Sequence, residues 1–94
     1  MSYKLVFKMQ ALKEWRKLNE VIKEQFKKKL EKRLIEPRVK SAKLNGMKNC
    51  YKIKLRNVGY RLVYEVRESD IVVSVVAVGK RERNLIYKTA SKRI

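Results

Sequence analysis

Three cations stand close together in two short segments in which apolar and polar side chains alternate. Lys52 and Lys54 lie two residues apart in residues 50–56 (CYKIKLR), and Arg61 follows in residues 60–64 (YRLVY). An alternation with a period of two predicts β-strands that bury one face and expose the other. The two segments therefore predict a pair of strands with one basic face.

The register of that pair follows from the alternation. If the apolar positions of both segments share a face, a short turn at residues 57–59 sets Lys54 directly opposite Arg61, with Lys52 beside them. Like charges opposite one another destabilise a sheet, whereas an anion held between them would offset the repulsion. We therefore favour a phosphate site built on a rigid sheet over a merely solvated basic face.

The overall charge indicates what carries the phosphate. The chain of 94 residues, which we expect to form a single domain over residues 1–94, has 26 Lys and Arg against 9 Asp and Glu, a formal net charge of +17. Such a field favours polyanions, with nucleic acid as the default partner, whereas solubility alone needs far less charge. No segment is apolar over about 18 residues and no signal peptide is visible, so we expect no membrane role.

The residue types that are missing restrict the chemistry. The chain has no histidine and a single cysteine, Cys50. This composition excludes His-based and cysteine-rich metal sites, Ser/His/Asp and Cys/His triads, and the paired-histidine chemistry of ribonucleases. Catalysis would have to use Lys, Arg, Tyr or the few scattered carboxylates, and we expect no metal and no cofactor. The single cysteine also fits a reducing cytoplasm.

The first half of the chain predicts the elements that support these cations. Residues 3–8 alternate as a first strand, and apolar residues at helical spacing predict a helix over residues 10–18. A longer helix is expected to follow Asn19, which can cap it, and to end before Pro37. The two helices should form a hairpin whose apolar stripe covers a sheet.

The second half predicts the rest of the sheet and a last helix. The β-branched run at residues 71–78 is typical of a strand buried on both faces, which we expect Gly79 to end. Residues 80–83 then form an exposed basic loop, and Asn84 can cap a short C-terminal helix. This order predicts an α+β fold, with the helices packed on one side of a small, mostly antiparallel sheet. The patterns leave the place of the first strand in the sheet open.

The cations suit one reaction in particular. Cleavage of RNA through its own 2′-hydroxyl needs that oxygen deprotonated, the dianionic phosphorane stabilised and the 5′-oxygen protonated. Fixed cations supply the second requirement, and mutual repulsion lowers the pKa of a lysine, which would make Lys54 opposite Arg61 a usable base. Tyr87 stays open between a functional phenol and a packed side chain, and spacing alone does not separate Arg81 from Arg83.

Four stretches of the chain resemble the RelE toxins of the RelE/ParE toxin–antitoxin superfamily. They are residues 11–18 (ALKEWRKL), 50–56 (CYKIKLR), 59–64 (GYRLVY) and 78–83 (VGKRER). The likeness covers nearly the whole chain, and it implies a RelE-like fold. It also implies the toxin of a type II toxin–antitoxin system, a metal-independent endoribonuclease that cuts mRNA in the ribosomal A site and so inhibits translation.

The resemblance also implies roles for five residues. Lys52 and Lys54 would bind or activate at the scissile phosphate, and Arg61 would stabilise its charge. Arg81 would support the leaving group or transition state, and Tyr87 would stack on or orient the RNA. All five are present in this sequence.

The partners implied by the resemblance are the 70S ribosome, its mRNA and a cognate antitoxin. The charge of +17 argues independently that this antitoxin is acidic. Asn45 departs from the basic residue expected beside Gly46, which puts one auxiliary RNA or ribosome contact in doubt.

Two alternatives stay open. The gyrase-inhibiting branch of the same superfamily shares the fold, but it generally lacks this set of Lys, Arg and Tyr. A non-catalytic RNA-binding or ribosome-binding module would use similar cations to bind without cutting.

Overall fold

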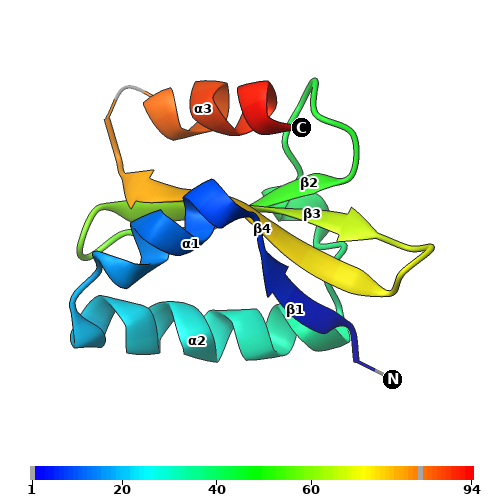
Figure 1. Cartoon of the computed structure of the whole chain (residues 1–94), viewed down its shortest axis with the longest axis horizontal. Coiled ribbons are helices and arrows are strands. Elements are labelled where there is room, and N and C mark those ends of the chain that lie inside the picture. Colours follow the sequence, from blue (N-terminus) through cyan, green and yellow to red (C-terminus); the bar gives the residue numbers. More distant parts are fainter. Residues whose placement is uncertain (1, 83) are drawn as a thin grey trace.

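A computed structural model describes residues 2–82 and 84–94 of the chain (Figure 1). In chain order the elements are β1 (Lys4–Phe7), α1 (Met9–Arg16), α2 (Glu20–Ile35), a 3₁₀ turn η1 (Lys40–Ala42), β2 (Cys50–Leu55), β3 (Tyr60–Arg67), β4 (Val72–Lys80) and α3 (Leu85–Arg93). The predicted α+β class is confirmed. Within the described residues, none of the helices has both the length and the apolar character needed to cross a membrane.

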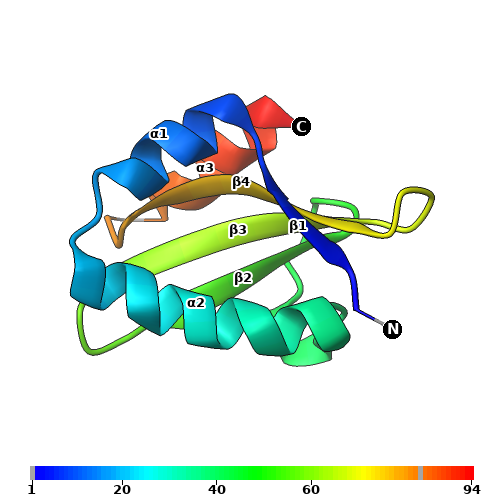
Figure 2. The same cartoon turned by 60° about the horizontal axis from the view of Figure 1, so that its bottom comes forward.

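The four strands form one mixed sheet in the order β1-β4-β3-β2 (Figure 2). β2 pairs with β3, and β3 with β4, in antiparallel fashion. β1 lies parallel to β4, with Lys4 paired to Val72 at the start of both strands. The sheet is thus mostly antiparallel, as predicted, and the strand whose place the sequence left open completes its other edge.

The predicted helical hairpin covers one face of the sheet. Asn19 caps α2, because its side-chain oxygen accepts a hydrogen bond from the backbone N–H of Ile22 at 3.0 Å. The helix ends two residues before Pro37, whose ring disfavours helical backbone in the residue before it. Phe26 and Leu30 are buried with Ile22 in a core cluster that joins α1 and α2 to β2, β3 and β4.

The third helix, α3, packs on the opposite face (Figures 1 and 2). The expectation that all helices lie on one side of the sheet was therefore wrong. The central strands carry apolar side chains on both faces, and Val63, Val76 and Ala77 would be exposed without a second cover. Ile86 and Ala90 of α3 are buried against them.

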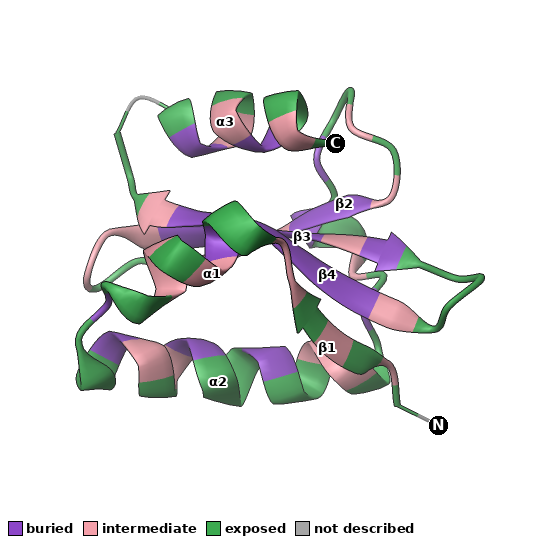
Figure 3. Ribbon diagram, in the orientation of Figure 1, coloured by how far each residue is buried: buried purple, intermediate pink, exposed green. Residues whose placement is uncertain are grey.

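The last strand runs further than predicted. β4 continues through Gly79 to Lys80, and Gly79 pairs with Arg61. Gly79 therefore does not end the strand. A Cβ at this position would stand 3.3 Å from Cδ1 of Ile86, so the missing side chain is what lets α3 approach the sheet closely. Figure 3 shows β4 buried along most of its length, as the β-branched run predicts.

One carboxylate ties both helical layers to the edge of the sheet. Among the residues that the structure describes, no strand pairs with this edge of β4 beyond β1, and Oε1 of Glu14 in α1 accepts from the backbone N–H of Val78 at 3.0 Å. Arg93 at the end of α3 donates to both carboxylate oxygens of Glu14 at 2.9 Å and to the carbonyl of Val76 at 2.9 Å. Glu14 and Arg93 thus satisfy the open edge and fix the end of α3 to α1.

Candidate active site

The β2–β3 pair carries the basic face in the predicted register. Lys54 lies directly opposite Arg61, and Lys52 lies opposite Val63. The alternate residues of both strands, Ile53 and Leu62 among them, are buried under α1 and α2. Because successive strand residues point to opposite faces, the three cations lie on the face that α3 covers.

α2 supports this strand pair from the other side. Nη1 of Arg33 donates to the backbone carbonyl of Lys52 at 3.1 Å and to the Tyr64 hydroxyl oxygen at 2.8 Å. The Tyr64 hydroxyl in turn donates to the carbonyl of Pro37 at 2.6 Å. The backbone that carries Lys52 is therefore held to the long helix and to the segment that follows it.

Arg61 is a nearly buried cation, with 9% of its surface exposed. Its Nη1 atom donates to the hydroxyl oxygen of Tyr87 at 3.1 Å and to Oδ1 of Asn84 at 3.0 Å. The guanidinium carbon lies 5.3 Å from the centre of the Tyr87 ring, within the range of a cation–π contact. α3 and the residue before it thus hold one end of the Arg61 guanidinium.

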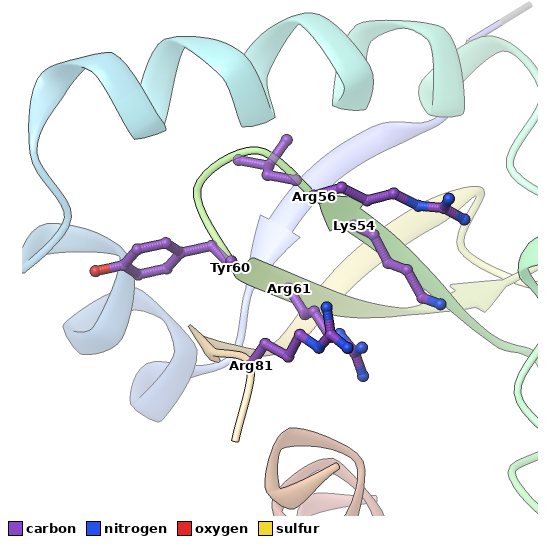
Figure 4. Close-up of a pocket in the computed structure, with 7 residues that line it drawn as sticks. Lys54, Arg56, Tyr60, Arg61 and Arg81 are labelled. Atoms are coloured by element: carbon purple, nitrogen blue, oxygen red, sulfur yellow. The ribbon is translucent and has the colours of Figure 1, made fainter. Parts of the chain in front are cut away.

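Arg81 reaches the same place from the end of β4. Its backbone N–H donates to the carbonyl of Gly59 in the β2–β3 turn at 2.7 Å, and Gly59 has the positive φ of 69° that this turn requires. Figure 4 shows the side chains of Lys54, Arg61 and Arg81 extending into one space, while Tyr60 points away. A cavity of about 240 Å³ lies there, lined by Lys54, Leu55, Arg56, Gly59, Tyr60, Arg61 and Arg81.

The electrostatics of the cavity act most clearly on Lys54. The pKa of its ammonium group lies below the ordinary lysine value, chiefly because Lys52 repels its charge; loss of hydration comes next, followed by Arg61. Arg56 and Arg81 lower the pKa further. The predicted repulsion of Lys54 by Arg61 is therefore present, although Lys52 lowers the pKa of Lys54 more than Arg61 does.

The structure brings the predicted residues together in two ways. Lys54, Arg61 and Arg81 line the cavity directly. Lys52 stands beside Lys54 on the same strand face, and Tyr87 joins the group through Arg61. The predicted exposed loop begins at Arg81, whereas Lys80 belongs to β4, and Arg83 lies outside the described residues. Asn45, the departure from the family pattern, is exposed in a turn on the connector between η1 and β2.

The sequence did not reveal the contact that Asn84 makes. It was expected to cap α3, and it does occupy the position before that helix, but its side chain makes no capping bond. The amide oxygen instead accepts from Arg61. Only the proximity of an Asn to the basic motif could have hinted at this, because the contact depends on how α3 folds back over β3.

The cavity is suited to a bound phosphate. Four cations line the cavity, Lys54, Arg56, Arg61 and Arg81, and no carboxylate of the described residues is among the lining side chains. Mutual repulsion among fixed cations is relieved when an anion binds, and it is relieved further when that anion gains charge in a transition state. The repulsion that lowers the pKa of Lys54 makes its proton easier to remove, and the two arginines beside it supply fixed positive charge.

Comparison with known proteins gives the family to which the chain is similar. Residues 5–85 match a family model described as the ParE toxin of a type II toxin–antitoxin system, parDE. The chain is 56% identical over 94 residues to the mRNA interferase toxin RelE of Escherichia coli K12, which covers 100% of this chain and 99% of that protein.

The chain is also similar to solved structures of RelE. The free state of an E. coli RelE variant with two arginines replaced by alanine matches with a TM-score of 0.92 at 54% identity, covering 100% of this chain and 99% of that one. RelE in the intact E. coli RelBE toxin–antitoxin complex matches with a TM-score of 0.84 at 56% identity, over 87% of this chain and 100% of that one.

Proposed function

The chain belongs to the ParE toxin family of type II toxin–antitoxin systems, and within it to the RelE toxins; from this premise we propose that it is an mRNA interferase that cuts mRNA on the ribosome. The observation that carries the proposal is the cavity in which Lys54, Arg61 and Arg81 meet with no carboxylate among the lining residues. This activity would stop translation of the cut mRNA.

We assign the steps of cleavage to these side chains. Lys54 in its neutral form takes the proton of the RNA 2′-hydroxyl, and the 2′-oxygen forms a bond to phosphorus. The bond between phosphorus and the 5′-oxygen then breaks; Arg81 donates a hydrogen bond to the leaving oxygen, and a solvent water gives it the proton that makes the 5′-hydroxyl. Lys52 and Arg61 stabilise the phosphorane, Arg61 through the Nε and Nη2 groups that contact no acceptor among the described residues. The products are a 2′,3′-cyclic phosphate and a 5′-hydroxyl.

We propose that Tyr87 positions Arg61 through its hydroxyl group. In the free protein its hydroxyl oxygen is occupied by Arg61. Its hydroxyl therefore orients the arginine, and stacking on RNA would use the ring. Both roles depend on α3 staying over β3.

The ribosome supplies what the cavity lacks. In-line attack requires the 2′-oxygen, phosphorus and 5′-oxygen to be aligned, and holding reactants in that geometry can supply much of the barrier reduction. We propose that mRNA in the ribosomal A site is presented in this alignment, while the basic surface binds the surrounding phosphates. Cleavage of naked RNA should then be far slower than cleavage of ribosome-bound mRNA.

The decisive experiment is incubation with a programmed ribosome followed by mapping of the mRNA ends. We expect cuts confined to the A-site codon and products that end in a 2′,3′-cyclic phosphate. Equal rates on naked and ribosome-bound RNA, or a 3′-hydroxyl product, would contradict the mechanism. Ribosome binding without any cut would indicate a binding module, and inhibition of DNA supercoiling by gyrase would indicate the other branch of the superfamily.

We further propose an acidic antitoxin as a partner in the cytoplasm. The relative in the RelBE structure is bound to its antitoxin, and a charge of +17 on so small a chain favours an anionic partner that folds as it binds. Contacts around Arg81 and α3 would inhibit cleavage most directly, because moving Tyr87 dismantles the site. Hydrogen exchange on the complex tests this: protection confined to the face away from α3, with cleavage still inhibited, would point to blocked ribosome binding instead.

A further inference from the structure

The side chain of Asn84 does not make the capping hydrogen bond that is common at its position before a helix. It directly precedes α3 and has a left-handed backbone, with φ 62° and ψ 19°. An Asn before a helix ordinarily accepts a hydrogen bond from one of the first helical N–H groups and so stabilises the helix. Here the left-handed backbone departs from the extended conformation of a capping residue, and the side chain makes no such bond, which leaves it available to another partner.

The partner of the Asn84 side chain is Arg61. Oδ1 of Asn84 accepts from Nη1 of Arg61 at 3.0 Å, and the same nitrogen donates to the Tyr87 hydroxyl oxygen at 3.1 Å. Both N–H groups of Nη1 are therefore used. In residues 2–82 and 84–94, Nε and Nη2 of Arg61 donate to no protein acceptor, which leaves them for an anion in the cavity.

We propose that Asn84 is a positioning residue that holds the Arg61 guanidinium in its phosphate-binding orientation; this deepens the function proposed above and rests on it. Arg61 needs such a restraint because Lys54 and Arg81 line the same cavity and repel it. A neutral amide oxygen holds the guanidinium without cancelling the charge that a phosphate must meet. A carboxylate at this position would hold the arginine more tightly but would neutralise it.

The test replaces Asn84 with glycine, which removes the amide yet adopts the left-handed backbone freely. Asn84 is exposed, so the change leaves the core intact. We expect single-turnover cleavage of ribosome-bound mRNA to fall about tenfold, the rate equivalent of one lost hydrogen bond to a charged group. Ribosome affinity should stay within about twofold, because many other cations bind the ribosomal phosphates.

The chain offers a matched control in Asn49. It too has a left-handed backbone, with φ 63°, and its Oδ1 accepts from Nη1 of Arg38 at 3.1 Å, away from the cavity. Asn49→Gly makes the same chemical change and should leave the cleavage rate unaltered. An equal loss of rate in both variants would overturn the proposal.

Two further measurements separate positioning from a structural role. In an Arg61→Ala background, Asn84→Gly should slow cleavage no further, whereas a role in starting α3 would give the same loss in either background and would refute the proposal. In the free protein, nitrogen NMR of the Arg61 guanidinium should show faster rotation of Nη1 in Asn84→Gly. Unchanged rotation of Nη1 would overturn the proposed role of Asn84, whether or not the protein cuts mRNA. Absence of cleavage by the wild-type protein would instead refute the proposed function.

Discussion

Replacement of Arg81 by alanine is the sharpest test of the proposed chemistry. Arg81 is exposed, and the backbone of this residue, not its side chain, makes the 2.7 Å bond to the Gly59 carbonyl. Arg81→Ala therefore removes a charge from the cavity while the end of β4 stays attached to the β2–β3 turn. We expect the variant to fold as the wild type does, with a melting temperature within a degree or two, since exposed changes of this kind alter stability little.

The expected magnitude follows from two separate effects. Removal of one preorganised donor from a transition state typically slows the chemical step by about 10²–10³-fold. The same substitution removes one unit from a net charge of +17, so the general attraction to the ribosome barely changes. Loss of one phosphate contact should lower the salt dependence of binding by about one ion. Cleavage and binding should thus respond very differently.

The assay is single-turnover cleavage of mRNA in a programmed ribosome, with ribosome affinity measured in parallel at several salt concentrations. Lys80→Ala is the matched control, because Lys80 is an exposed cation one residue away that does not line the cavity. We expect it to cleave at close to the wild-type rate. An equal loss in both variants would mean that Arg81 acts only through the overall field, and intact cleavage with lost binding would make it a docking residue.

Three further outcomes are expected. If neutral Lys54 is the base, the cleavage rate rises with pH until its pKa is reached; Lys52→Met, which removes the largest repulsion, should move that limb to higher pH, and Lys54→Ala should abolish it. An unmoved limb would leave Lys54 a purely electrostatic role. Gly79→Val should push α3 outward and slow cleavage more than Gly79→Ala, and hydrogen exchange should show faster opening of α3 but not of α2. Burial raises the pKa of the Cys50 thiol to about 11, so a maleimide should react with the unfolded chain but not with the native one at neutral pH, and stability should decline above about pH 9 as the unfolded thiol ionises first.

The sequence alone predicted that Lys54 lies opposite Arg61, because both residues belong to a local hairpin. The alternation in β2 and β3 defines the two faces, and the short turn leaves one register in which Lys54 meets Arg61. The periodicity of the two N-terminal helices and the Asn19 cap of α2 are equally local signals. Each of these features is determined by residues close together in the chain.

The features that sequence reasoning missed depend on contacts between distant segments. The side of the sheet that α3 covers depends on apolar residues that face both ways in β3 and β4, and a short helix with two buried residues gives little sign of its location. Gly79 was predicted to end the strand because the sequence does not show why a glycine is needed there. The need comes from the close approach of Ile86, which belongs to another element. The same holds for Asn84, whose partner Arg61 is two elements away.

The parallel pairing of β1 with β4 has a consequence for how the chain folds. Lys4 pairs with Val72, so the first strand of the chain finds its neighbour in the last one, across all the other strands and two of the helices in sequence. Proteins dominated by such distant contacts fold more slowly than those built from neighbouring segments. Until β4 is available, α1 and α2 have an incomplete surface to cover, and the segment that carries Arg81 and Tyr87 has nothing to attach to. Because Arg81 and Tyr87 both follow β4 in the chain, a chain in which β4 has not yet paired with β3 holds two of the five predicted site residues out of position.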